Sequence, residues 1–164
     1  MPELKSKLNL GAGKDIKEGY LNLDIVPLKG IDVVHDLNKI PYPFRDNQFE
    51  EILCLNVLEH LDDFQKVLEE LHRIGSNGAR VKIGVPYWNS LLVWADPQHK
   101  RGFTLDTFTF FEKSHYYNFR FKVIKQELIG SKVGKLFPGP LRYLLSYFLC
   151  NIVEGMRVEL EVVK

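Results

Sequence analysis

The chain has 164 residues, which suits one domain and is too short for two ordinary ones. Its hydrophobic fraction of 45% and charged fraction of 26% are typical of a globular protein with a real core. A formal net charge of +1 gives no basis for nucleic-acid binding through bulk electrostatics. We therefore expect a single domain over residues 1–164 without a nucleic-acid partner.

The ends and the cysteines set further expectations. The start, MPELKSKLNL, has no apolar signal segment, and the longest apolar stretch, about 141–153, is too short to span a bilayer. A cytoplasmic protein is therefore expected. Cys54 and Cys150 lie far apart in apolar runs, which favours two buried free thiols over a disulfide or a metal pair. No Cys and His residues have zinc-like spacing, so no metal site is expected.

The first third of the chain is typical of short strands. We expect them at residues 7–10, 20–24, 32–36 and 49–56. The polar stretch 14–19 has only Ile16 to bury, so it predicts a loop or a single turn where a crossover helix would usually lie. The reduced helical cover near the N-terminus follows from this shortness.

A helix is predicted directly after the fourth strand. Asp62 and Asp63 can cap it, and it should stop near Gly75. Its apolar residues fall at i, i+3, i+4 and i+7, which is one helical face: Phe64, Val67, Leu68 and Leu71. A fifth strand follows at 80–85, so strands and a helix alternate as in an open, mostly parallel sheet.

The second half of the chain is less regular. Residues 86–111 are rich in aromatic and polar side chains, which indicates a long loop or lid. A strand is expected at 117–128 and a last one at 156–163. The apolar helix predicted at about 141–153 should pack on the sheet, with a dimer face or an acceptor cover as alternatives. The expected fold is α/β: a Rossmann-like open sheet with an antiparallel last strand and helices on both faces.

Polar residues and glycines stand where the predicted strands end. Gly11 and Gly13 follow the first strand, Asp24 ends the second, Asp36 ends the third and Asn56 ends the fourth. Ligands of open parallel sheets bind outside the carboxyl ends of the strands, so these residues should share one site. Glycines let the backbone approach a ligand closely, and a carboxylate can accept two hydrogen bonds from a ribose diol.

These motifs resemble a known family. LNLGAG, LNLD, VVHDL, FEEILCLNVLEHL and VKIGVP, in this order, are similar to the motifs of class I S-adenosyl-L-methionine-dependent methyltransferases, nearest to the small methyltransferase-11-like branch. The resemblance covers about residues 7–104. It implies S-adenosyl-L-methionine as cofactor and methyl transfer to an oxygen or nitrogen of a small-molecule or glycan-type acceptor.

The resemblance also implies a role for each strand-end residue. Asp24 would hold the ribose hydroxyls, Asp36 would lie near the adenine amino group, and Asn56 would lie near the methionine end. A solvated acid, a loop cap and a strand-end turn, respectively, are the alternatives. The cofactor-binding residues implied in this way are Leu10, Gly11, Ala12, Gly13, Asp24, Ile25, Asp36, Leu37, Asn56 and His60.

Candidate acceptor-side residues lie in the long loop. His99 is the best candidate for a general base, with His60 as a second, although both can equally be inert loop histidines. A base is needed only when the acceptor carries a proton that must leave. Lys100 and Arg101 could dock an anionic acceptor. The tryptophans of this loop, Trp88 and Trp94, could shield the site, although ordinary packing is the plainer role.

Two other functions compete with methyl transfer. A nicotinamide-binding enzyme would need a third glycine and a helix after the Gly-x-Gly turn, where this chain has Lys14 and Asp15. A non-catalytic scaffold member of the methyltransferase fold remains an alternative. The segment between the glycine turn and the second strand is short, and Asn9 stands where the family has an acid. A homodimer that covers the open side is a further alternative.

Overall fold

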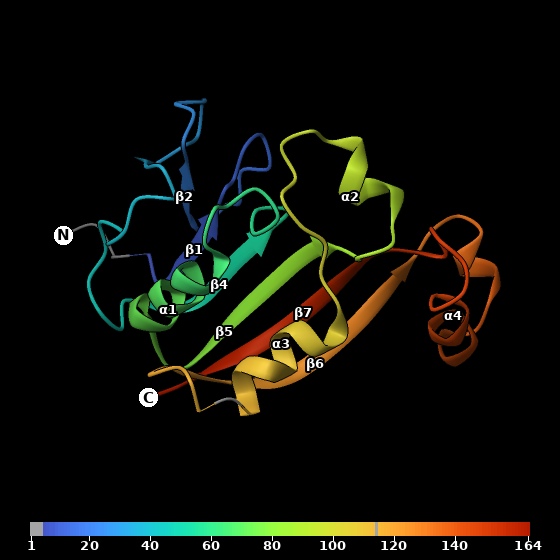
Figure 1. Cartoon of the computed structure of the whole chain (residues 1–164). Helices are drawn as coiled ribbons and strands as arrows, with labels where there is room; N and C mark the ends of the chain where they lie inside the picture. Colours follow the sequence, from blue (N-terminus) through green and yellow to red (C-terminus); the bar gives the residue numbers. More distant parts are fainter. Residues whose placement is uncertain (1–4, 114) are drawn as a thin grey trace.

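The computed structural model describes residues 5–113 and 115–164, which form a seven-stranded sheet with the strand order β3-β2-β1-β4-β5-β7-β6 (Figure 1). The strands are β1 Lys7–Leu10, β2 Leu21–Asp24, β3 Val33–Val34, β4 Phe49–Leu55, β5 Gly75–Pro86, β6 Arg120–Gly130 and β7 Val153–Val163. The strands β1 to β5 run parallel, and β7 is antiparallel to both of its neighbours. The expected Rossmann-like sheet with an antiparallel last strand is confirmed.

The helices are short. They are α1 Phe64–Ile74, α2 Leu91–Ala95, α3 Leu105–Lys113, the 3-10 helix η1 Gly134–Leu136 and α4 Gly139–Leu145. The predicted α1 is confirmed, because the side chain of Asp63 accepts a hydrogen bond from the Lys66 N–H at 3.1 Å and Gly75 ends the helix. No helix in the described part of the chain is long and apolar enough to cross a membrane.

A pair of buried asparagines replaces the helix that usually links the first two strands. The amide of Asn9 donates to the carbonyl of Asp15 at 2.9 Å and to Oδ1 of Asn22 at 3.0 Å. The same Asn22 oxygen accepts from the Lys17 N–H at 2.9 Å. These bonds satisfy the two buried amides and hold the short loop across β1 and β2. The predicted loop at 14–19 is therefore present.

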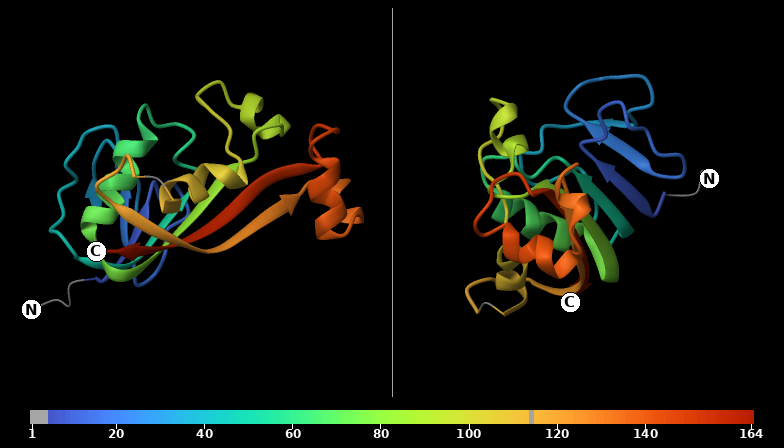
Figure 2. Two further views of the ribbon diagram at one scale, coloured as in Figure 1. Left: turned by 60° about the horizontal axis from the view of Figure 1, so that its bottom comes forward. Right: turned by 90° about the vertical axis from the view of Figure 1, so that its right-hand side faces the viewer.

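Helices cover one face of the sheet, which corrects the expectation of helices on both faces. The rings of Phe64 in α1 and Phe111 in α3 lie 6.0 Å apart, so α1 and α3 lie side by side on that face (Figures 1 and 2). On the opposite face charged side chains pair between strands, as Lys82 does with Glu51 at 2.9 Å. Paired charges can stay in water, so that face needs no helix to cover it.

The segment predicted as a lid contains a helix that the sequence analysis missed. Its first turn is held by Thr104, whose N–H donates to the hydroxyl of Thr107 at 3.1 Å. Phe108 and Phe111 are buried and carry the packing of α3 on the sheet. The many aromatic residues of this stretch hid the spacing of these two buried ones, and only residues 87–104 are a long connection with one short helix.

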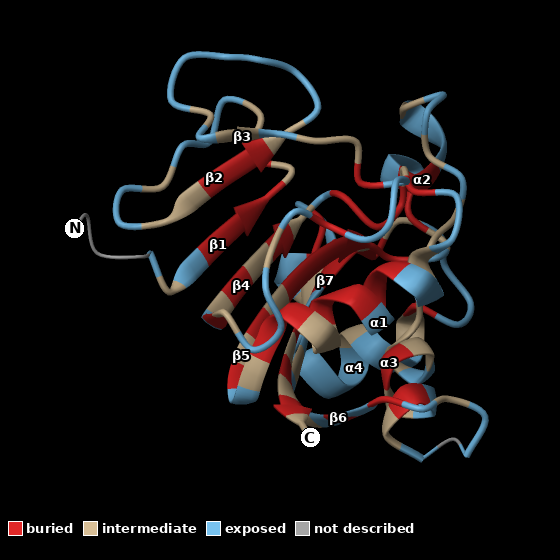
Figure 3. Cartoon of the chain, turned by 90° about the vertical axis from the view of Figure 1, so that its left-hand side faces the viewer, coloured by how far each residue is buried: buried red, intermediate tan, exposed pale blue. Residues whose placement is uncertain are grey.

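The apolar helix expected at 141–153 is also corrected. The helix α4 ends at Leu145, none of its residues is buried, and the chain turns before β7 begins at Val153 (Figure 3). The Arg142 side chain donates to the carbonyls of Gly134 and Phe137 and, at 3.3 Å, to that of Leu128, so α4 is tied to the turn after β6 and to the end of β6 itself. Cys150 lies here and is exposed, whereas Cys54 is buried as expected.

Candidate functional site

A cavity of about 360 Å³ lies at the carboxyl ends of β1, β2 and β4. It is called the first cavity below. Its walls come from the glycine turn, the loops after β2 and β3, and the loop after β4: Gly11, Asp24, Ile25, Asp36, Leu37, Asn38, Asn56, Val57, His60, Leu61 and Gln98. Of the predicted cofactor residues, Leu10, Ala12 and Gly13 do not line it. Leu10 is fully buried in the core, and Ala12 and Gly13 continue the turn that Gly11 begins.

Asp24 fixes the glycine turn with both carboxylate oxygens. Oδ2 accepts a hydrogen bond from the Gly13 N–H at 2.8 Å, and Oδ1 accepts one from the Val26 N–H at 2.9 Å. An ionised carboxylate offers about four lone-pair sites, so roughly two stay available toward the cavity. The geometry leaves enough acceptors for a diol.

Gly11 and Gly13 differ in the space around the position where a side chain would begin. Both have a left-handed backbone, with φ of 64° at Gly11 and 51° at Gly13. A Cβ at Gly11 would lie 2.4 Å from Cγ2 of Val57, whereas one at Gly13 would meet nothing within 4 Å. Gly11 therefore lets the turn pack against the loop after β4, and Gly13 leaves open space beside the turn.

Asp36 and Asn56 hold their own loops and also face the first cavity. The Asp36 carboxylate accepts from the Asn38 N–H at 3.0 Å, which is a loop cap. Asn56 has a φ of 55°, a conformation that asparagine tolerates better than most residues, and its N–H donates to Gly84 at 2.8 Å. Asp36 therefore caps its loop and Asn56 forms a strand-end turn, and both residues also line the first cavity.

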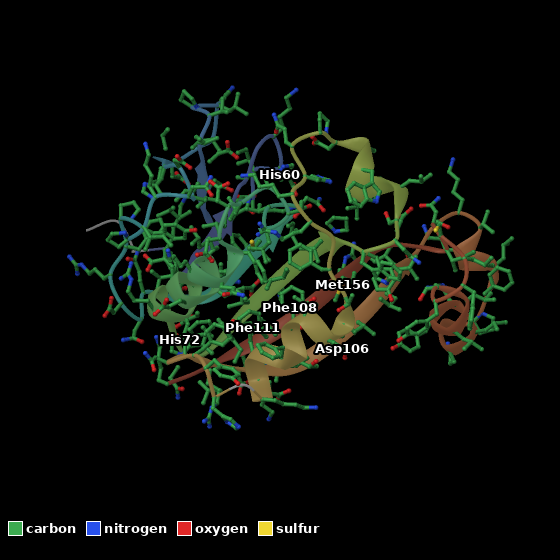
Figure 4. All side chains as sticks on the ribbon, in the orientation of Figure 1. His60, His72, Asp106, Phe108, Phe111 and Met156 are labelled. Carbon is green, nitrogen blue, oxygen red and sulfur yellow. The ribbon has the colours of Figure 1, made fainter. Side chains whose placement is uncertain are left out.

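A second cavity, of about 590 Å³, adjoins the first at the ends of β4, β5 and β7. The two cavities share Asn56 and His60 in their walls. The second is lined by Leu55, Asn56, Glu59, His60, Gly84, Val85, Pro86, Leu92, Ala95, Asp96, His99, Ile129, Glu154, Gly155, Met156 and Arg157. Figure 4 labels two of these residues, His60 in the loop after β4 and Met156 in β7.

Three titratable side chains meet in the second cavity. The rings of His60 and His99 have centroids 4.6 Å apart, and Nδ1 of His99 lies 2.8 Å from the carbonyl of Leu92. Burial raises the pKa of Glu59, and burial together with the neighbouring His99 lowers the pKa of His60. The predicted base candidates are therefore neighbours, and they lie beside a buried acid.

Residues 12–83 of the chain match the family model described as "Methyltransferase domain". The match starts inside the glycine turn and ends in β5, so it includes most of the first cavity. This part of the chain is therefore similar to methyltransferase domains. The chain is 28% identical to an uncharacterised protein of Methanocaldococcus jannaschii, over 92% of this chain and 71% of that one.

Several solved structures with a similar fold are described as methyltransferases. One from Mesorhizobium loti, described as S-adenosylmethionine dependent, has a TM-score of 0.64 at 15% identity and covers 98% of this chain and 93% of its own. A Haloferax volcanii protein solved with the Trm112 methyltransferase activator has a TM-score of 0.63 at 17% identity, over 100% of this chain and 86% of its own. At these identities the likeness shows the fold.

A third structure was solved with a product of the cofactor. It is the Burkholderia thailandensis 1,6-didemethyltoxoflavin-N1-methyltransferase with S-adenosylhomocysteine, with a TM-score of 0.59 at 14% identity, over 96% of this chain and 71% of its own. The family match and this structure support S-adenosylmethionine as the cofactor, and the first cavity of the chain has groups that suit that molecule. Asp24 keeps acceptors for a diol, the buried Leu37 offers an apolar wall, and Gly13 leaves room beside the turn.

Several predicted acceptor-side residues lie elsewhere in the structure. Lys100 pairs with the Asp62 carboxylate at 2.5 Å, and Arg101 donates to the Asp62 carbonyl at 2.9 Å. Both thus fasten the loop to the start of α1, and neither lines a cavity. Trp88 and Trp94 are 44% and 79% exposed and line neither cavity, so the idea that they shield the site is wrong.

Other wall residues had no signal in the sequence. Glu154 and Arg157 come from the start of β7, which reaches this edge of the sheet because β7 runs antiparallel to β5. Gln98 enters the first cavity from the loop after α2. Only the tertiary arrangement brings these side chains to the site, whereas Glu59 could have been found as the neighbour of His60.

Proposed function

We propose that the chain is an enzyme that transfers a methyl group from S-adenosylmethionine to an oxygen or nitrogen of a small-molecule or glycan-type acceptor. The observation that carries the proposal is the junction of the two cavities at Asn56 and His60. One cavity has the groups that suit the donor, and the other is an adjoining space of the size that small ligands occupy. The reacting atoms would meet at the shared wall.

In this proposal each wall of the first cavity has a task. Asp24 accepts hydrogen bonds from the ribose hydroxyls, and Asp36 accepts one from the adenine amino group while Leu37 packs on the ring. Ile25 lies at the rim, 59% exposed. The turn Leu10-Gly11-Ala12-Gly13 passes its backbone beside the methionine part. Asn56 and His60 close the sulfonium end.

The chemistry asks for alignment more than for a reactive side chain. S-adenosylmethionine supplies an electrophilic methyl group, and the electrons of the broken C–S bond stay on sulfur. The two cavities would hold donor and acceptor in line, which can contribute roughly 7–11 kcal/mol to lowering the barrier. Where the acceptor is a hydroxyl or an ammonium, His99 or His60 would take its proton and pass it to water.

The second cavity favours an acceptor with both polar and apolar parts. Its wall combines apolar side chains, such as Val85 and Met156, with the charged Glu154 and Arg157. The wall has three carboxyl side chains, Glu59, Asp96 and Glu154, against one arginine, which favours an acceptor without negative charge. The names of the relatives identify acceptors only for those proteins, so the acceptor here is assigned by chemical class.

A non-catalytic scaffold is the second candidate, and the short cofactor side favours it. A short loop held by Asn9 and Asn22 links β1 and β2, where relatives would have a helix. A scaffold that has lost the site would not bind S-adenosylmethionine. Cofactor affinity therefore separates the two candidates.

The test is calorimetric titration of the protein with S-adenosylmethionine. Loss of a charge-assisted hydrogen bond costs about 1.5–3 kcal/mol, so Asp24→Ala should weaken binding by roughly tenfold to a hundredfold. Because Asp24 also holds the Gly13 N–H, circular dichroism must show an intact fold for this variant. Asp106→Ala is the matched control, since this acid lies in α3 and lines neither cavity. Equal affinity of Asp24→Ala and wild type would contradict the assignment.

A further inference from the structure

We propose that Glu59, His60 and His99 form a binding site for a divalent transition-metal ion in the second cavity. Each residue offers one ligand atom, and these atoms all lie within 4.8 Å of one another. Metal–ligand bonds of about 2.0–2.2 Å place tetrahedral ligand atoms roughly 3.4 Å apart, so each side chain would move toward the ion by up to roughly one ångström. The binding of the ion does not depend on the proposed methyl transfer. The role of the ion toward the acceptor does rest on that proposed function.

His99 is held in the way that metal-binding histidines are held. Nδ1 of His99 lies 2.8 Å from the Leu92 carbonyl, which can only accept, so Nδ1 carries the proton and Nε2 keeps its lone pair. The ring of His60 packs against the ring of His99, with the two ring centroids 4.6 Å apart. A second hydrogen bond from a ring N–H to a carbonyl orients almost every imidazole ligand and fixes its tautomer.

Glu59 supplies an independent observation that points to a ligand. The residue is 1% exposed, and its Oε2 has no hydrogen-bond partner. Taking a carboxylate out of water without a partner is costly, and buried charges are normally paired or bound to a metal. The Lys100 N–H donates to the Glu59 carbonyl at 2.8 Å, which ties the loop of His99 to the loop of Glu59 and His60. An ion would pair this carboxylate.

The ligand set selects the kind of ion. Two imidazole nitrogens and one carboxylate oxygen suit Zn²⁺, Mn²⁺ or Fe²⁺, whereas Mg²⁺ and Ca²⁺ prefer oxygen ligands throughout. Three protein ligands leave at least one position open, as in metal sites that bind a substrate. Asp96 lies close by, with its Oδ2 4.0 Å from Nε2 of His99, and can bind a water on the ion.

The open position gives the ion a role in the proposed reaction. An acceptor hydroxyl bound to the ion would lose its proton to water at a lower pH, because a metal lowers the pKa of a coordinated O–H group. The lone pair of the oxygen then forms the new C–O bond, and the C–S electrons stay on sulfur. In this arrangement His99 is a ligand and not the base, and the acceptor is a hydroxyl compound.

The sequence spacing gave no sign of this site. Glu59 and His60 are neighbours in the loop after β4, and His99 comes from the loop after α2. The expectation that the chain has no metal site considered only clusters that are local in sequence. The fold brings the two loops together.

The test is metal binding by the full chain without cofactor. After removal of metals with a chelator, calorimetric titration with Zn²⁺ and with Mn²⁺ should show one ion per chain, and bound Mn²⁺ should change its electron paramagnetic resonance signal. His99→Ala should weaken binding at least tenfold to a hundredfold, since removing even an outer partner of a ligand has that effect. His115→Ala is the control, because this histidine is exposed and lines neither cavity, and it should bind as wild type does.

Glu59→Gln is the second variant, and it keeps the size of the buried side chain. It should also bind the ions at least tenfold more weakly while circular dichroism shows an unchanged fold. The proposal is overturned if wild type binds neither ion with one-to-one stoichiometry, or if His99→Ala and Glu59→Gln bind as wild type does. S-adenosylmethionine affinity of the same metal-free protein is measured in parallel. Cofactor binding without metal binding overturns only the metal site, and the reverse result overturns the proposed function.

Discussion

The turn after β1 and the loop around α2 contribute to the same edge of the sheet, but they are held in different ways. The turn stands on fully buried side chains, such as Leu8, Leu10 and Leu23, and Asp24 locks it from the next strand. In α2 only Val93 is buried, and the loop that follows is joined to the rest by a few hydrogen bonds from Lys100 and Arg101.

This difference suits the tasks proposed for the two cavities. A donor molecule shared by a whole family calls for a wall whose geometry is fixed by the core. An acceptor that differs among relatives calls for a wall that can change without loss of the fold. Substitutions in the turn should therefore affect stability strongly, and substitutions at the surface of α2 should affect it little.

The largest effect is expected for Gly11→Ala. The left-handed backbone costs roughly 1–2 kcal/mol for a residue with a Cβ, and overpacking against Val57 adds about 1–3 kcal/mol. The free energy of unfolding, measured by urea denaturation, should fall by the sum of these terms. Gly78→Ala is the control, because Gly78 has a φ of 82° and a Cβ there would meet nothing within 4 Å. If both variants lose the same free energy, the contact with Val57 is unimportant.

The smallest effect is expected for Trp94→Ser. This side chain is 79% exposed, and surface substitutions away from special features usually change the free energy of unfolding by at most about 0.5 kcal/mol. The affinity for S-adenosylmethionine should stay as in wild type. Val93→Ala, in the same helix, removes buried atoms and should destabilise more. A loss for Trp94→Ser that equals the loss for Val93→Ala would show that α2 is packed more tightly than described.

The sequence predicted those elements that depend on local signals. The bounds of β1, the Asp63 cap and the end of α1 at Gly75 follow from residues within a few positions. The positions of Asp24, Asp36 and Asn56 in one wall follow from the rule that parallel strands end at the same edge. For these elements, local sequence signals and the rule for parallel strands were sufficient to predict the structure.

The elements that the sequence did not predict depend on contacts made across the fold. The helix α3 packs against Phe64 and the sheet, and Arg142 ties α4 by hydrogen bonds to the turn after β6 and to Leu128 in β6. The meeting of Glu59 and His60 with His99 needs two loops to be tied together. Hydrophobic periodicity carries no information on such contacts, because it reports only which face of an element is apolar.

The crystal structure of this chain with S-adenosylhomocysteine tests the central claim most directly. We predict that the ligand lies in the first cavity, with its ribose hydroxyls within hydrogen-bond distance of Asp24 and its adenine beside Leu37. Its sulfur should point past Asn56 and His60 into the second cavity. A ligand bound elsewhere, or one whose sulfur faces away from the second cavity, would contradict the account.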